Sequence, residues 1–281
     1  MKKLLNFIFF YIKNLFKYNL FNFFYKILIS KRKNFVYIND YLKNGIVKIS
    51  SIDQNKINSI NNEIELQKPS IKNFSQIYSI NNEIKKNIHS IVNNDLKTVI
   101  EELEFYYQSK IKLSWAGITR NHSIQDESEY FSNFFHTDAY VFTMVKFFIN
   151  LHDVDDNSGA LELIPKNQKI SLIKKMLKEF NTRIDPRTIK NKIKIKKNLG
   201  KKGELTIVKT TEYLHRAGNP KKNKTRDMLF LEFVVISKKQ KQTSHNNSLY
   251  TTDYEDENNM TKEYSKPHDF KSIYKLFISY F

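Results

Sequence analysis

The second half of this sequence is divided into short apolar segments of strand length, and that division limits the fold more than any other feature. The segments are rich in β-branched and aromatic residues, and turn-forming residues separate them, as at 155–159 and 218–220. Strands at this spacing are typical of β-sandwiches and barrels. The predicted strands are 111–118, 141–151, 160–164, 205–208 and 228–236.

Helices are predicted to flank these strands on the N-terminal side. Apolar residues recur at helical spacing through 84–107, which indicates one or two helices that cover a sheet, within a stretch of mixed helix and strand from 34 to 112. The chain has 281 residues, 40% of them hydrophobic, and this is enough for one substantial core. We therefore expect a mainly β fold of the α+β class, in one domain over 34–236 with its core at 111–236.

A His-x-Asp motif at His136 and Asp138 is the first candidate for a functional site. Alternate residues of a strand point to the same face, so the imidazole and the carboxylate would meet at one point. Such a pair and a distant histidine form the facial triad that binds Fe(II) in non-haem oxygenases and leaves three coordination positions open. The motif alone is weak evidence, because a hydrogen-bonded surface pair would have the same sequence.

Four downstream histidines could supply the third ligand. His245 and His268 lie in a polar tail, and His152 opens an acidic loop that is too close along the chain to cross a sheet easily. His215 follows a predicted strand and precedes a Gly-Asn-Pro turn. We therefore predict that His215 completes the metal site.

Arginine is rare in this chain, which makes the position of Arg226 informative. Only six of the 47 basic residues are arginine, and a bias toward AT-rich codons is a sufficient explanation for most of the net charge of +18. Arg226 lies eleven residues after His215, at the start of an apolar strand, where a turn between antiparallel strands would place it beside the metal. A guanidinium binds a carboxylate through two parallel hydrogen bonds and stays charged when buried, which suits the far carboxylate of 2-oxoglutarate.

Together with their flanking sequence, these residues resemble the phytanoyl-CoA dioxygenase family. The resemblance rests on His136-x-Asp138, on the stretch 146–165, and on His215-Arg-Ala-Gly-Asn-Pro followed by Arg226. It covers about residues 115–236. Family members usually continue Ile-Pro with Gly-Ser-His, whereas this chain has Lys166-Asn167-Gln168, so the loop shape and substrate contacts differ there.

The resemblance implies a double-stranded β-helix core (a jelly roll of the cupin type) that holds Fe(II) and uses 2-oxoglutarate and O₂, releasing succinate and CO₂. It implies that the two histidines and Asp138 are the metal ligands and that Arg226 anchors the co-substrate. Lys146 and Arg120 are further candidates for co-substrate binding. Lys146 would reach into the pocket or extend to solvent, and Arg120 would meet an anion or form a surface salt bridge.

Three segments surround or interrupt this core. Residues 1–33 are basic and aromatic, with no apolar run long enough to span a bilayer, and two interpretations stay open: a helix lying on a membrane surface, or one packing on the domain or a second subunit. Residues 169–200 are rich in lysine and are predicted to form a helical insertion broken at Asp185-Pro186. Residues 237–281 form a polar tail that ends in an aromatic helix.

Two function classes compete on this sequence. The first is a dioxygenase that hydroxylates a small molecule, lipid- or sugar-linked, with no nucleic-acid partner. The alternative is a non-catalytic basic module that binds anionic membranes or nucleic acid through its charge and keeps a vestigial barrel. The retention of all four site residues favours the enzyme. The absence of cysteine excludes disulfides and is typical of a reducing compartment, so we expect a cytoplasmic protein, peripheral to a membrane if residues 1–33 bind one.

Overall fold

The computed structural model describes most of the region from residue 37 to residue 235. The described residues are 37–38, 41, 45–49, 52–72, 75–107, 111–124, 133–136, 138, 144–164, 184–189, 193–210 and 213–235. The predictions made for 1–33, for the tail 237–281 and for Lys166-Asn167-Gln168 lie outside the described residues.

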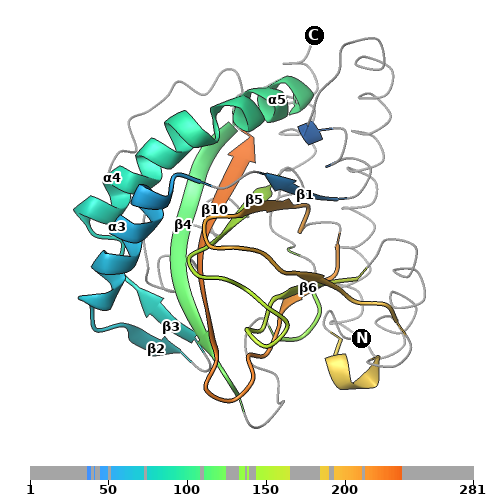
Figure 1. Ribbon diagram of the computed structural model, residues 1–281. Coiled ribbons are helices and arrows are strands. Elements are labelled where there is room, and N and C mark those ends of the chain that lie inside the picture. Colours follow the sequence, from blue (N-terminus) through green and yellow to red (C-terminus); the bar gives the residue numbers. More distant parts are fainter. Residues whose placement is uncertain are drawn as a thin grey trace, which may run out of the picture.

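A seven-stranded antiparallel sheet forms the larger layer of the fold (Figure 1). Its two longest strands, β4 and β10, pair along their whole length, and β5 pairs with the other edge of β10. In spatial order the strands are β1 (Ile46–Ile49), β8 (Leu205–Val208), β5 (Val145–Asn150), β10 (Thr225–Val235), β4 (Ile111–His122), β3 (Ser75–Tyr78) and β2 (Ser70–Lys72). The strands expected from sequence are thus confirmed, and β10 begins three residues earlier than predicted, so that Arg226 lies inside it.

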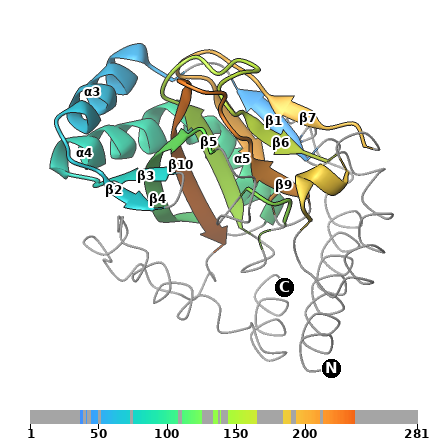
Figure 2. The ribbon, with the colours of Figure 1, turned by 90° about the horizontal axis from the view of Figure 1, so that it is seen from below.

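A smaller antiparallel sheet contains β7 (Lys196–Asn198), β6 (Leu161–Leu163) and β9 (His215–Ala217) in that spatial order. Bridges at Phe135 and His136 extend it, because Phe135 pairs with Ile184 and His136 pairs with His215. Seen from below, β6, β7 and β9 lie together to one side of β4, β5 and β10 (Figure 2).

The inner face of the larger sheet packs against the smaller sheet. One cluster of buried side chains takes members from both layers: Phe148, Val208 and Met228 from the larger sheet, and Leu161 and Leu163 from the smaller one. Side chains of neighbouring positions on β10 alternate between faces, so Met228 points inward while Leu229 points outward. The space between the sheets is therefore lined by every second residue of each strand.

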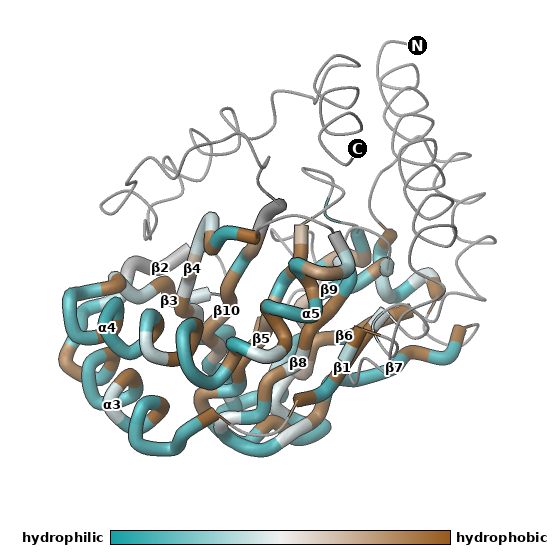
Figure 3. Tube along the Cα trace, turned by 90° about the horizontal axis from the view of Figure 1, so that it is seen from above, coloured by the Kyte–Doolittle hydropathy of each residue, from teal (hydrophilic) through white to brown (hydrophobic). Residues whose placement is uncertain are grey.

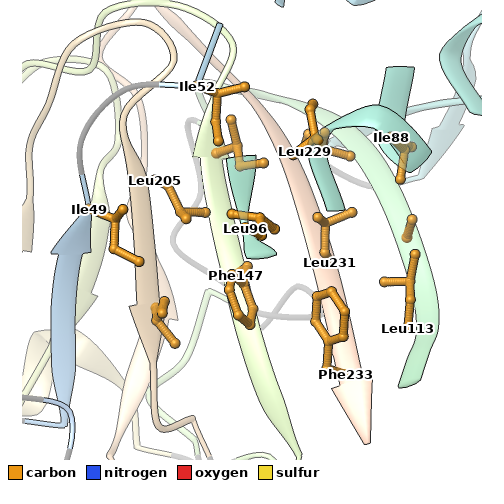
Figure 4. Close-up of a cluster of buried hydrophobic side chains, with 14 of the residues drawn as sticks. Ile49, Ile52, Ile88, Leu96, Leu113, Phe147, Leu205, Leu229, Leu231 and Phe233 are labelled. Carbon is orange, nitrogen blue, oxygen red and sulfur yellow. The ribbon is translucent and has the colours of Figure 1, made fainter. Parts of the chain in front are cut away.

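Helices cover the outer face of the larger sheet. They are α3 (Gln54–Glu65), α4 (Asn82–Ser90) and α5 (Lys97–Tyr107), with a π-helical turn at Ile91–Asp95 between the last two. Figure 4 shows sheet residues such as Phe147, Leu229 and Leu231 packed with Ile88 and Leu96 from the helical layer, all of them fully or almost fully buried. This agrees with the helices predicted over 84–107. Among the described helices, none is long and apolar enough to cross a membrane.

Two helix starts are encoded locally. The side chain of Asp53 accepts a hydrogen bond from the backbone N–H of Asn55 at the start of α3, and Asn81 accepts one from Ile84 at the start of α4. In Figure 3 these two helices are coloured mainly as hydrophilic, whereas β5 and β10 are mainly hydrophobic. The helices therefore depend on a narrow stripe of isoleucines, such as Ile57, Ile60 and Ile64, to attach to the sheet.

The last residues of the predicted insertion at 169–200 form a strand and not a helix. Residues 196–198 form β7, which pairs with β6, so this part belongs to the smaller sheet. Its two lysines point to solvent from an edge strand, where lysine is common because it discourages pairing with other chains. The described part of the predicted break, Asp185-Pro186, begins a short 3₁₀ helix at Pro186–Thr188.

A buried carboxylate links β10 to the helical layer. Asp227 is 2% exposed, and its oxygens accept hydrogen bonds from Arg120 Nε (2.9 Å) and Nη2 (2.7 Å). His152 Nε2 lies 3.0 Å from the same carboxylate, and Arg120 also pairs with Glu65 at the end of α3. Burial raises the pKa of Asp227, but the hydrogen bonds from His152 and Arg120 outweigh it and hold this pKa below its usual range.

We predict that Asp227→Asn lowers the free energy of unfolding by about 3 kcal/mol, because Arg120 would be left without its buried partner. The folded-state pKa of Asp227 is depressed, so its contribution is present above the unfolded pKa and is lost as the pH falls. The free energies of unfolding of the wild type and of Asp227→Asn, measured with urea, should therefore become more similar below about pH 4. Asp153→Asn, which changes an exposed carboxylate paired with Lys201, is the matched control and should leave stability unchanged. An equal loss of stability in Asp227→Asn and Asp153→Asn would contradict a stabilising role for the buried Asp227–Arg120 pair.

Candidate metal centre

Two histidines from distant parts of the chain are held opposite each other by backbone hydrogen bonds. The N–H of His136 donates to the carbonyl of His215 (3.0 Å), and the N–H of His215 donates to the carbonyl of His136 (2.9 Å). Residues that exchange both hydrogen bonds in an antiparallel pair lie directly opposite, and their side chains share one face. The ring centroids are accordingly 4.6 Å apart.

Each imidazole is oriented by a carbonyl of its own segment. His136 Nδ1 lies 2.8 Å from the carbonyl oxygen of Phe134, and His215 Nδ1 lies 3.0 Å from that of Tyr213. A carbonyl only accepts, so Nδ1 donates in both cases and Nε2 keeps its lone pair. Both Nε2 atoms lie close to Asp138, and this is the arrangement that a metal ligand requires.

Asp138 completes the cluster. Its backbone N–H donates to the carbonyl of Thr210 (2.9 Å), which fixes the carboxylate beside the two rings. Oδ1 lies 3.8 Å from His136 Nε2, and Oδ2 lies 3.7 Å from His215 Nε2. One ligand atom from each of the three residues lies within 4.8 Å of the others. The structure therefore brings together all three predicted ligands.

The spacing within this cluster fits a shared cation better than direct contact. Distances of 3.7–3.8 Å are too long for hydrogen bonds between the imidazoles and the carboxylate, and Oδ2 of Asp138 has an ion pair with Lys146 but no hydrogen bond of good geometry among the described residues. A divalent metal ion placed between the three side chains could be bound by all of them, with bonds of about 2.1 Å. Two imidazoles and one carboxylate are also the donor set expected for Fe(II) in an open site.

The carboxylate is ionised and ready to bind. Burial raises the pKa of Asp138, but the positive charge of Lys146 beside it, with a further electrostatic influence of the two imidazoles, outweighs that effect and holds this pKa well below the usual range. Lys146 Nζ lies 3.1 Å from Asp138 Oδ2 and 3.6 Å from Glu232 Oε2. Lys146 therefore reaches into the site, one of the two alternatives left open by the sequence.

Arg226 is a buried arginine on β10. It is 3% exposed, and its Nε and Nη1 atoms have no hydrogen-bond partner among the described residues. Burial lowers the pKa of Arg226 to about 10, opposed by the charge of Glu162. It shares the inward face of β10 with Met228, two residues along the strand. A guanidinium in this environment is stabilised by a carboxylate or a similar anion, and the role of Arg226 in co-substrate binding stays a prediction.

Other candidates have different partners. The contacts of Arg120 with Asp227 and Glu65 favour the salt-bridge alternative, and its role in co-substrate binding stays a prediction. His152 also binds Asp227, which agrees with its rejection as a metal ligand. Arg216, next to a ligand, pairs with Glu162 at 2.7 Å and not with the cluster.

Sequence reasoning missed Glu232. This residue lies directly opposite Lys146 in the pairing of β10 with β5, and burial raises its pKa, partly offset by the charge of Lys146. An acidic residue inside the apolar run 228–236, at an inward-facing position, was the available signal.

Comparisons with known proteins bear on the fold. No protein-family profile matches the chain, and no curated protein sequence matches it. Among solved structures, HygX from Streptomyces hygroscopicus with nickel and 2-oxoglutarate bound matches with a TM-score of 0.55 and 9% identity, covering 73% of this chain and 88% of that one. The non-haem α-ketoglutarate-dependent epimerase SnoN of nogalamycin biosynthesis matches with a TM-score of 0.50 and 12% identity, covering 71% and 81%.

This chain has the fold of those enzymes. The carbocyclase SnoK, also non-haem and α-ketoglutarate-dependent, matches with a TM-score of 0.50 and 10% identity over 73% of this chain and 86% of that one. The likeness confirms the predicted cupin-like core with flanking helices, within an α+β fold. Membership of the phytanoyl-CoA dioxygenase family is not confirmed, since the shared feature is the fold at low identity.

We predict that the metal-free protein binds one equivalent of Co²⁺ at this cluster, monitored by isothermal titration and by the visible absorption of the bound ion. His215→Ala should weaken binding by more than about 100-fold, because removing a ligand costs more than removing an outer partner. His152→Ala removes a histidine outside the cluster and should bind as the wild type does. Unchanged Co²⁺ affinity in His215→Ala would place the metal elsewhere.

Proposed function

We propose that this protein is an Fe(II)- and 2-oxoglutarate-dependent dioxygenase that hydroxylates a small molecule and releases succinate and CO₂. The proposal depends above all on one observation: a His-Asp-His cluster and a buried arginine, whose Nε and Nη1 atoms have no hydrogen-bond partner among the described residues, both occur within the fold of 2-oxoglutarate-dependent enzymes. Each is explained when a cation and a dicarboxylate bind together.

His136, Asp138 and His215 would hold the iron. Their three donor atoms would leave half of an octahedral coordination shell for other ligands, as an oxygenase requires. When bound, the iron and 2-oxoglutarate supply the oxidising chemistry, and the protein's own residues bind, orient and exclude water. The two Nδ1 hydrogen bonds keep both rings in the ligating orientation without help from the metal.

Arg226 would bind the far carboxylate of 2-oxoglutarate. Its position on the inward face of β10 keeps the guanidinium away from water, where a charge-assisted pair with a carboxylate is stronger. Apolar side chains of the inter-sheet cluster, among them Phe148 and Met228, exclude water from the same space. Trp115 and Phe230 pack with their rings tilted by 46° and their centroids 4.2 Å apart, and they extend this apolar lining.

A small-molecule substrate is supported by the compounds bound to proteins of this fold. HygX was crystallised with hygromycin B, and SnoN with nogalamycin RO. Proteins of this fold include an epimerase and a carbocyclase as well, so the outcome of the reaction is an independent question. We favour hydroxylation, and product analysis by mass spectrometry with ¹⁸O₂ distinguishes it from the other outcomes.

The first test of this function is spectroscopic. Fe(II) and 2-oxoglutarate added without oxygen should give a weak visible charge-transfer band, which reports chelation of the iron by the co-substrate. The band should be lost in Asp138→Ala. A folded wild-type protein that binds Fe(II) and shows no band would contradict the proposal.

The second test concerns the anion site. Arg226→Gln should raise the dissociation constant for 2-oxoglutarate by about 10- to 100-fold, the cost of losing a charge-assisted pair, while Fe(II) affinity stays close to that of the wild type. Substrate-independent succinate production should fall with it. Arg187→Gln is the control, because Arg187 is exposed and pairs with Asp185. An equal effect in both variants would exclude Arg226 as the anchor.

A further inference from the structure

Lys146 stands between two acidic side chains in the interior of the fold. It lies on β5, directly opposite Glu232 on β10 and Val208 on β8. Its side chain is 17% exposed, that of Glu232 is 21% exposed, and that of Asp138 is 7% exposed. A lysine at such a depth requires a specific reason, because lysine is rarely buried unless it is paired.

The ammonium is closer to the ligand carboxylate than to its cross-strand partner. Nζ lies 3.1 Å from Asp138 Oδ2 and 3.6 Å from Glu232 Oε2. Glu232 is positioned independently, since Oγ of Ser114 donates to its Oε1 at 3.4 Å and to its backbone carbonyl at 3.0 Å. Two anions are thus placed within reach of one cation.

The pair with Asp138 addresses a problem of the metal-free site. Two neutral imidazoles do not neutralise a buried carboxylate, and an unpaired buried charge is strongly destabilising. Lys146 supplies the missing positive charge, so the cluster can fold before any metal arrives. The arrangement of the three ligands then precedes metal binding.

The same pair opposes metal binding. A divalent cation beside Asp138 would lie close to an ammonium, and the two positive charges repel each other in a medium of low dielectric constant. Glu232 offers the ammonium a second carboxylate without a change in the backbone. Rotation about the terminal bonds of the lysine side chain is enough to exchange one partner for the other.

We propose that Lys146 is the built-in counter-ion of the metal site, neutralising Asp138 before the metal binds and pairing with Glu232 afterwards. The inference rests on the proposed function in one respect: the triad must bind a divalent cation. It makes Lys146 and Glu232 positioning residues that set metal affinity. Neither of them is a ligand.

The test is a double-mutant cycle on Mn²⁺ affinity, measured by electron paramagnetic resonance on the full-length protein without co-substrate. Lys146→Met removes the competing cation and should tighten Mn²⁺ binding by about tenfold. Glu232→Gln removes the second anion, so that Lys146 stays on Asp138, and should weaken binding by about tenfold. In the double variant the effect of Glu232→Gln should largely disappear, because no lysine is left to relocate.

A second measurement guards against a purely structural effect. Lys146→Arg keeps the charge and should bind Mn²⁺ nearly as the wild type does. Lys146→Met should lower the melting temperature of the metal-free protein, and saturating Mn²⁺ should restore most of that loss. If Lys146→Met does not fold without metal, the Mn²⁺ affinities of Glu232→Gln and Lys146→Arg still test the counter-ion role. The first variant should bind Mn²⁺ more weakly than the wild type, and the second should bind it nearly as the wild type does.

Different failures have different meanings. Weaker Mn²⁺ binding in Lys146→Met, or additive effects in the double variant, would overturn the counter-ion role and leave the metal site intact. No Mn²⁺ binding by the folded wild-type protein would overturn the proposed function and, with it, this inference. Mn²⁺ binding that survives His136→Ala would show that the ion lies at another site, which overturns both.

Discussion

The candidate site depends on one pair of backbone hydrogen bonds. His136 and His215 are almost eighty residues apart, and the mutual N–H to carbonyl bonds between them place both rings on one face of the smaller sheet. Without this register the third ligand would not meet the first two, because a slip of one residue turns a side chain to the opposite face. The larger sheet, the helices and the apolar clusters serve to hold that register in a dry interior.

Charge balance in this interior connects the separate features of the site. Asp138 and Arg226 are buried and Lys146 and Glu232 are mostly shielded from water, so each of the four charges requires a partner of opposite charge. Lys146 lies within ion-pair distance of both carboxylates, whereas two nitrogen atoms of Arg226 have no hydrogen-bond partner among the described residues. Under the proposed function, one divalent cation and one dicarboxylate bind together at these residues.

Much of this could be predicted from local patterns. The strands and the helices over 84–107 followed from apolar periodicity, and the clustering of His136, Asp138 and His215 followed from the His-x-Asp motif and the placement of histidine. Strand β7 could not be predicted in this way, because its exposed lysines give no apolar pattern although its backbone pairs at a sheet edge. Glu232 could not be predicted either, since a single acidic residue in an apolar run has no local pattern that distinguishes a buried partner of lysine from a surface charge.

The sequence by itself determined the chemical groups of this protein and the faces they occupy within each strand, because side-chain alternation is a property of neighbouring residues. Only the tertiary structure decided which strands lie side by side. That choice paired Arg120 with Asp227 and left two nitrogen atoms of Arg226 with no hydrogen-bond partner in the described part of the chain, although both arginines lie on paired strands. Strand pairing joins residues that are distant along the chain, and its free energy comes from burying whole faces, which no short stretch of sequence contains.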